Sequence, residues 1–298
     1  MCNKVSKIKI FSVLIIGLLA VSSGSILIKF TQGVPSVVIA SYRLIFSSVI
    51  LFAITKFKKI SLDKMNKKEW TLCLLSGFFL AMHFITWITS LNYTSVASSV
   101  VLVTTSPIFV GILSLVILKE KQNLFLILGI ILSVTGSIIL TLGDSGIKGF
   151  IIQNKDVFIG DMLALTGSLM VSLYLLIGSK LRNNVSLMSY IVRVYGFTAA
   201  ILIIISFILG LNFTGYSVKS YFLMFLLAIL PQLIGHTSYN WALKHLKSSM
   251  VAIVSMGEPI GATILAYLLL KETLSLTQFA GIILIFASIM IASRKGEK

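Results

Sequence analysis

The sequence predicts an all-α polytopic membrane protein in which ten transmembrane helices form two inverted five-helix repeats. Three observations lead to this fold class: the composition, the spacing of the apolar segments and an internal repeat. Of the 298 residues, 57% are hydrophobic and only 11% are charged. Because a soluble domain usually has about 25% charged residues, we expect this chain to lie in a lipid bilayer.

The apolar segments are long enough to cross a bilayer, which takes about 20 residues in a helix. Short connections with polar residues separate them. We place the ten spans near residues 8–30, 36–55, 70–91, 95–117, 123–142, 158–179, 187–210, 220–243, 248–270 and 275–293.

The basic residues indicate how these spans are oriented. If the N-terminus is cytoplasmic, most lysines and arginines fall in cytoplasmic connections, and the outer side holds only Lys29, Lys148, Lys155, Lys219 and Lys271. This imbalance follows the positive-inside rule and predicts a cytoplasmic (inner) membrane protein with both termini in the cytoplasm. The net charge of +16 is therefore a topology signal, and nucleic acid is not an expected partner.

Two segments reveal an internal repeat. Ser106–Glu120 reads SPIFVGILSLVILKE and Glu258–Glu272 reads EPIGATILAYLLLKE, and one offset without a gap also aligns Gly129 with Gly281. We expect one repeat in residues 1–147 and the other in residues 148–298. Since each contains five spans, the second enters the membrane from the opposite side. In transporters built this way, the substrate site lies near the midplane between the repeats.

The chain resembles the EamA-type members of the drug/metabolite transporter superfamily over nearly its whole length. The residues that carry the resemblance are Gly24 to Lys29, Arg43, Leu91 to Ser95, Pro107, Glu120 and Gly129 in the first half, and Lys180, Arg193, Pro259, Glu272 and Gly281 in the second. The resemblance implies an inner-membrane carrier that moves small metabolites, often amino acids outward, through a cavity between two inverted halves.

Glu258 is the first candidate site residue. It lies about ten residues into its span, which places it about 15 Å deep in a hydrocarbon core of about 30 Å. An ionisable group at that depth is a candidate coupling group for protons or a contact for a substrate ammonium group. The alternative is a protonated structural carboxyl that is bonded to a neighbouring helix.

Arg43 and Arg193 are the next candidates, at similar depths of about 10 Å on opposite sides of the membrane. Each could bind a substrate carboxylate with two donors. Each could equally be an anchor whose side chain extends to the lipid headgroups.

Aromatic and polar residues on the third helix of each half complete the candidate set. His83 and Trp87 share one helix face at a spacing of four, and His236 shares a face with Tyr239 and Asn240. These residues could line a substrate cavity. A histidine that is simply hydrogen-bonded within the bundle is the competing interpretation.

Other classes of function have weaker support. Cys2 and Cys73 offer neither a disulfide framework nor metal-ligand spacing, so no metal or other cofactor is expected. Gly143–Gly146 matches a short hydrolase-like string, but Gly, Asp and Ser are ordinary turn residues, and we do not expect an enzyme. A membrane scaffold or signalling protein is the remaining alternative. The expected partners are a small-molecule substrate and lipid; proton coupling and homo-oligomer formation stay open.

Overall fold

The computed structural model describes residues 5–31, 33–94, 96–119, 122–145, 155–270 and 275–294. The predicted boundary between the repeats at 147/148 lies outside these residues, as do Glu120, Lys148, Lys271 and Glu272, so those predictions stay predictions. In chain order the helices are α1 (Lys7–Ser22), α2 (Gly24–Phe30), α3 (Ser36–Phe57), α4 (Lys67–Ser90), α5 (Val96–Val103), α6 (Ser106–Ile117), α7 (Leu124–Ser145), α8 (Lys155–Leu181), α9 (Leu187–Ile208), α10 (Val218–Leu227), the π-helix η2 (Ala228–His236), α11 (Thr237–Ala242), α12 (Ser248–Ser255), α13 (Glu258–Leu270) and α14 (Leu276–Ser293).

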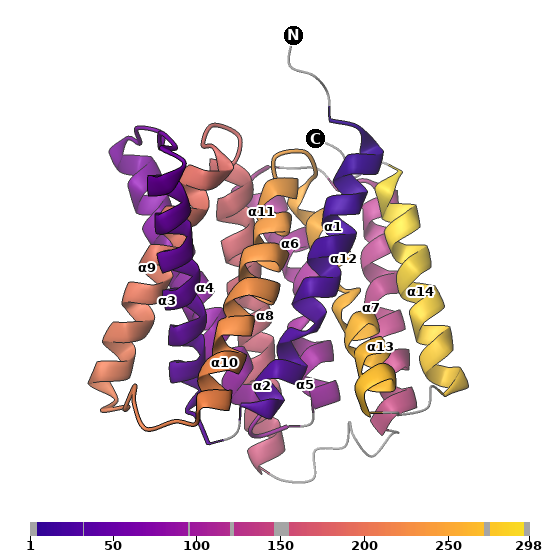
Figure 1. Ribbon diagram of the computed structural model, residues 1–298. Helices are drawn as coiled ribbons and strands as arrows, with labels where there is room; N and C mark the ends of the chain where they lie inside the picture. The colour runs from indigo at the N-terminus through magenta and orange to yellow at the C-terminus, as the bar shows by residue number, and fades with distance from the viewer. Residues whose placement is uncertain are drawn as a thin grey trace.

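The prediction of an all-α polytopic membrane protein is confirmed. Within the described residues, eight helical segments are long and apolar enough to cross a membrane, and Leu124–Ile139 in α7 is a shorter apolar helix. Helices α12 and α13 together occupy the place of the ninth expected span. The helices run roughly parallel to one another and form a single bundle (Figure 1).

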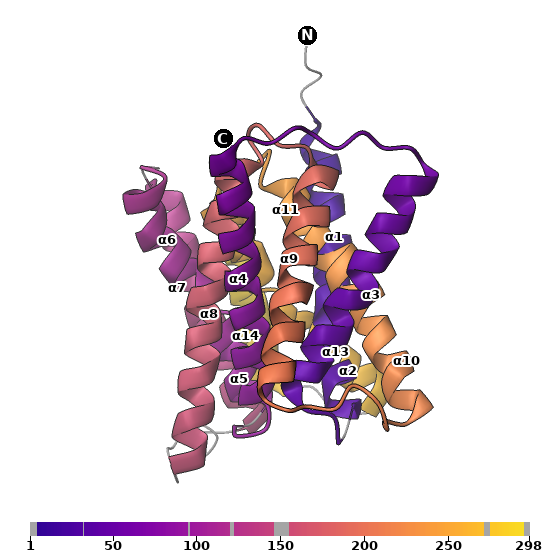
Figure 2. The same cartoon turned by 90° about the vertical axis from the view of Figure 1, so that its left-hand side faces the viewer.

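The two halves of the bundle have opposite orientations. Helix α1 begins and α14 ends at the upper end of the bundle in Figure 1, whereas α8, the first helix of the second half, begins at the lower end. The loop between α3 and α4 crosses the upper end, and the corresponding loop between α9 and α10 crosses the lower end (Figure 2). We call these the Asp63 end and the Phe213 end, after a residue in each loop.

Two spans that the sequence predicted as continuous helices are interrupted. Helix α5 ends at Val103 and α12 ends at Ser255, which are four residues before Pro107 and Pro259 respectively. A proline ring clashes with the carbonyl four residues earlier and lacks an N–H for the helix. Each proline therefore starts a new helix, so the two breaks occupy equivalent positions in the two repeats.

Close helix contacts fix the position of the first span. At Gly235 an added Cβ would overlap Cγ2 of Val21 and would lie 3.3 Å from the Gly17 carbonyl oxygen. At Gly17 an added Cβ would lie 2.6 Å from Cβ of Ser238. Small residues permit this approach of backbones, as is common between transmembrane helices. The contact holds α1 against η2 and brings Val21 to the centre of the bundle.

Candidate functional site

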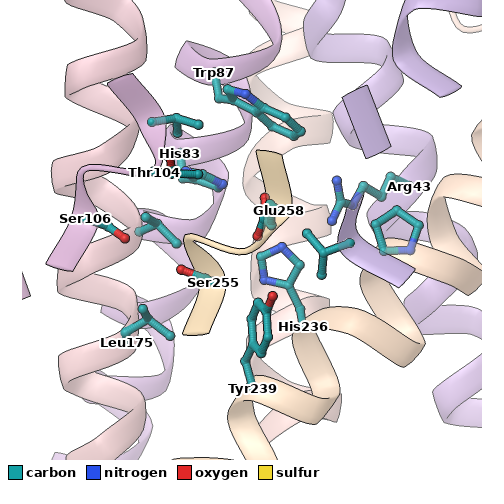
Figure 3. Close-up of a pocket in the computed structure, with 14 residues that line it drawn as sticks. Arg43, His83, Trp87, Thr104, Ser106, Leu175, His236, Tyr239, Ser255 and Glu258 are labelled. Atoms are coloured by element: carbon teal, nitrogen blue, oxygen red, sulfur yellow. The ribbon is translucent and has the colours of Figure 1, made fainter. Parts of the chain in front are cut away.

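A cavity lies between the two repeats and takes equal numbers of lining residues from each (Figure 3). From the first repeat these are Val21, Arg43, His83, Trp87, Val103, Thr104 and Ser106, and from the second Val171, Leu175, Pro231, His236, Tyr239, Ser255 and Glu258. Its volume is about 40 Å³. Since one water needs about 10–15 Å³ by this measure, the cavity has room for a few waters and must widen to admit a metabolite.

Arg43 extends from α3 into the bundle, and only 1% of its surface is exposed. Its Nε donates a hydrogen bond to Oε1 of Gln232 at 2.9 Å, and its guanidinium carbon lies 4.1 Å from the centre of the Phe84 ring. Nη1 and Nη2 have no hydrogen-bond partner among the described residues. The alternative in which the Arg43 side chain extends to the headgroups is not seen, because Gln232 and Phe84 hold the side chain inside the bundle.

Glu258 is the first residue of α13, directly after the break at Met256 and Gly257. Its half-buried side chain lies near the middle of the site, with Arg43 to one side and His83 to the other (Figure 3). No described residue hydrogen-bonds to its carboxylate. The expected bond from a neighbouring helix to a structural carboxyl is therefore not seen. The N-terminal end of α13 favours a negative charge at this position.

His83 and Trp87 stack on each other from successive turns of α4, with ring centres 5.9 Å apart and an interplanar angle of 11°. The His83 Nδ1 lies 2.9 Å from the carbonyl oxygen of Gly167. Because a carbonyl oxygen only accepts, Nδ1 carries the proton and Nε2 is left as an acceptor in the neutral ring. The Nε1 of Trp87 has no partner within the described chain.

The second repeat contributes His236 and Tyr239 from the end of η2 and from α11. The ring of His236 lies 6.4 Å from that of His83 and 6.3 Å from that of Tyr239. The Tyr239 hydroxyl makes no hydrogen bond to a described residue. The two histidines thus meet from opposite halves of the molecule.

Two of the candidate residues do not line the cavity. Asn240 is fully buried, and its Nδ2 lies 2.5 Å from the hydroxyl of Tyr174 and 3.3 Å from that of Tyr195. Arg193 lies toward the Asp63 end, where its Nη2 donates to the Asp63 carbonyl at 2.7 Å. The expected equivalence of Arg43 and Arg193 is therefore not reflected in their contacts, because the α3–α4 loop folds over α9 and binds Arg193.

The sequence interpretation missed two residues, one that contacts a cavity residue and one that lines the cavity. Gln232, which orients Arg43, lies one helical turn before His236, and this spacing could have identified it. Ser106 lines the cavity at the position equivalent to Glu258 in the first repeat. The alignment of the two repeats could have identified Ser106.

The inverted repeats, the interrupted helices and the cavity between the halves define an inverted-repeat membrane protein of the transporter class. The family comparison agrees with this class. The sequence profile of the EamA-like transporter family matches residues 8–142 and again residues 158–294. This chain belongs to that family, as its resemblance to the drug/metabolite transporters predicted.

Proteins of similar sequence carry transporter names. A protein of Archaeoglobus fulgidus named "Uncharacterized transporter" is 26% identical over 266 residues, which is 86% of this chain and 87% of that protein. The "Uncharacterized transporter YetK" of Bacillus subtilis is 21% identical over 270 residues, covering 90% of this chain and 81% of YetK. A solved crystal structure superposes with a TM-score of 0.81 over 98% of both chains at 15% identity. That likeness shows the fold alone.

Proposed function

We propose that this protein is a secondary transporter that exports small metabolites such as amino acids across the cytoplasmic membrane by alternating access. The cavity between the repeats is the substrate site in this proposal. Glu258 binds the substrate ammonium group or a coupling proton, and Arg43 binds a substrate carboxylate. His83, Trp87, His236 and Tyr239 form the remaining polar wall.

One observation carries the proposal. Arg43 keeps two guanidinium nitrogens without a partner in the described structure, while the half-buried side chain of Glu258 lines the same cavity. Buried polar groups without partners cost free energy, and the cost is larger when they are charged. A ligand with an acidic and a basic group would satisfy both side chains at once.

The positions of the basic residues support the proposed orientation. The α3–α4 loop and its flanks carry the exposed lysines Lys56, Lys58, Lys59, Lys64, Lys67 and Lys68 at the Asp63 end. By the positive-inside rule this end faces the cytoplasm. The first and last helices also have their terminal ends there (Figure 1), which supports our proposal that both termini are cytoplasmic.

The small volume of the cavity supports alternating access. A space of about 40 Å³ is too small for a metabolite, so a substrate can enter only if one repeat moves relative to the other. The interrupted spans α5–α6 and α12–α13 place non-helical backbone beside this cavity, as in carriers with discontinuous helices.

A ligand screen on the purified protein tests the proposal. Binding to the native state raises the apparent melting temperature, so a zwitterionic amino acid should raise that of the wild type. Arg43→Lys keeps the charge but loses the planar pair of donors, and Glu258→Gln keeps the shape but loses the charge. Both variants should need at least tenfold more ligand for the same shift.

The matched control is Asn240→Ser, which changes a buried polar residue behind the cavity wall. It should lower the melting temperature without ligand and retain the ligand-induced shift. If amino acids give no shift while nucleosides or cationic drugs do, the substrate class is wrong. If the two cavity variants respond like the wild type, the site assignment is wrong.

A further inference from the structure

The α3–α4 loop, residues 58–66, belongs to the first repeat and contacts the second repeat at one end of the bundle. Asp63 lies in this loop. One carboxylate oxygen of Asp63 accepts a hydrogen bond from the backbone N–H of Ser186 at 2.6 Å, and the Asp63 N–H donates to Oγ of Ser189 at 2.7 Å. Both serines lie at the start of α9, so the loop of one repeat caps the second helix of the other.

Arg193 completes this contact from the next turn of α9. Its Nη2 donates to the Asp63 carbonyl at 2.7 Å, and its Nη1 donates to the Ser189 carbonyl at 2.8 Å. Its guanidinium carbon lies 5.0 Å from the centre of the Trp70 ring in α4. Arg193 thus binds the loop and the start of α4 simultaneously, and none of these contacts reaches the central cavity.

The opposite end has an equivalent contact. Asp63 follows Arg43 by the same number of residues as Phe213 follows Arg193. The Phe213 carbonyl, in the α9–α10 loop, accepts hydrogen bonds from the Tyr42 hydroxyl at 2.7 Å and the Tyr221 hydroxyl at 3.0 Å. The rings of Tyr42 and Phe213 also meet at 5.7 Å. Loop carbonyls at equivalent positions therefore bind a side chain of the opposite repeat at each end. The two loops themselves cross opposite ends of the bundle (Figure 2).

We propose that these two loop contacts are the gates of the transport path. The Asp63 gate consists of Asp63, Ser186, Ser189 and Arg193, and the Phe213 gate consists of Phe213, Tyr42 and Tyr221. This inference rests on the proposed transport function. It assigns a gating role to Arg193. It also implies that the α3–α4 loop closes the path at one face and that the α9–α10 loop closes it at the other.

The contacts explain why opening must alternate. Each gate joins the α3 side of the first repeat to the α9 side of the second, and α3 and α9 pack on each other between the two gates. A tilt of α3 relative to α9 that separates the helices at one end brings them together at the other. The hydrogen bonds of both gates are formed in this structure, which agrees with the small volume of the cavity.

Cysteine accessibility tests the gates without any substrate. Ser255→Cys, in a background with Cys2→Ser and Cys73→Ser, places a thiol on the cavity wall. A small membrane-impermeant methanethiosulfonate reagent is then applied to right-side-out and to inverted vesicles. Labelling rates from each face report how often each end opens.

Arg193→Ala should raise the labelling rate at least fivefold from the face that carries Asp63, and should lower it or leave it unchanged from the other face. Ser189→Ala, which removes the hydroxyl that accepts from the Asp63 N–H, should act in the same direction with a smaller rise. Tyr42→Phe removes one hydroxyl and should raise labelling from the Phe213 face. Lys180→Ala is the matched control, because Lys180 is an exposed cation at the Asp63 end, and it should change neither rate.

Equal changes at both faces, or no change with Arg193→Ala and Ser189→Ala, would overturn the proposal. Gel filtration shows whether Arg193→Ala reduces the amount of folded protein. If it does, the labelling rates of Ser189→Ala and Tyr42→Phe test the gates instead. The outcome is separate from that of the transport proposal. One-sided labelling without any transported solute would support the gates and contradict the substrate assignment, whereas transport with unchanged labelling would contradict the gates alone.

Discussion

Arg43 and Glu258 are oriented by different means in the same cavity. Gln232 and Phe84 hold the guanidinium from one side, and its two outer nitrogens stay without a described partner. Glu258 is oriented by its place at the start of α13. The guanidinium and the carboxylate therefore remain available to a third molecule, which is the arrangement expected of a binding site and not of a structural ion pair.

Glu258→Gln tests the coupling role of this residue. The substitution keeps the size and the hydrogen-bonding capacity but removes the titratable group. If Glu258 carries the coupled proton, solute transport by the variant should lose its dependence on the pH gradient or stop, while the amount of folded protein stays the same. The measurement is solute flux in vesicles between pH 5.5 and 8.5. A variant with the wild-type pH profile would make Glu258 a non-coupling residue.

At the residue scale, the sequence indicated which residues lie deep in the spans better than it indicated where their side chains point. Depth along a span follows from counting residues, and this identified Glu258 and Arg43 as buried charges. The direction in which a side chain points around its helix depends on neighbouring helices. Consequently Arg193, at a depth similar to that of Arg43, lies under the α3–α4 loop, and Asn240 lies behind the cavity wall. The transport roles of all eight candidates stay predictions.

At the scale of elements, the packing of α1 against η2 shapes one wall of the cavity. Gly235 in η2 faces Gly17 and Val21 of α1 without room for a side chain. Gly235→Ala should therefore destabilise the fold by about 1–3 kcal/mol through overpacking. Thermal unfolding in detergent measures this. Gly196→Ala is the control, because an added Cβ at Gly196 in α9 meets nothing within 4 Å and alanine favours a helix.

A lowered melting temperature for Gly235→Ala together with an unchanged or raised one for Gly196→Ala would confirm the contact. Equal effects of the two substitutions would mean that α1 does not pack closely on η2. The close contact was not predictable from the sequence, because the glycines in several spans are similarly placed and only the three-dimensional packing distinguishes them.

The Asp63 contact should depend on pH. Hydrogen bonds from Ser186, with a smaller effect from Ser189 and the nearby charge of Arg193, hold the pKa of Asp63 below its usual value of 3.8. Arg182 is a further charged group near this carboxylate. A lowered pKa in the folded state means that ionised Asp63 stabilises the fold above pH 3.8, and that this stabilisation is lost as the pH falls through the folded-state pKa.

Asp63→Asn should accordingly lower the melting temperature at pH 7, and the difference from the wild type should shrink as the pH falls toward 3. Differential scanning fluorimetry at both pH values measures it. Lys64→Gln changes a neighbouring exposed charge and should show no such convergence. A difference for Asp63→Asn that stays constant from pH 7 to pH 3 would contradict the assigned hydrogen bonds.

The interrupted helices mark the limit of prediction at this scale. The sequence located the spans near residues 95–117 and 248–270 but not their breaks, although Pro107 and Pro259 were recognised as equivalent. Hydropathy reports only whether a segment is apolar. Whether a proline bends a helix or starts a new one depends on what satisfies the freed backbone groups, and that is a property of the packed bundle.

At the scale of the whole molecule, the repeats and the basic loops together predict the topology. A cysteine at Asn92 or Asn212, in loops at the Phe213 end, should react with an impermeant maleimide on intact cells. A cysteine at Lys64, in the loop at the Asp63 end, should react only after the membrane is permeabilised. The background again lacks Cys2 and Cys73. The reverse labelling pattern would mean that the protein has the opposite orientation, and labelling of Asn92 and Asn212 from different faces would contradict the inverted repeat.

The central claim is that a solute crosses the membrane through the cavity between Arg43 and Glu258. Counterflow in proteoliposomes tests it most directly, using the amino acid that gives the largest thermal shift. Vesicles loaded with unlabelled solute should transiently accumulate labelled solute through the wild-type protein. Arg43→Lys should reduce the initial rate at least tenfold at subsaturating solute, and Asn240→Ser should not. No accumulation above protein-free vesicles, or equal rates for the wild type and Arg43→Lys, would contradict the claim.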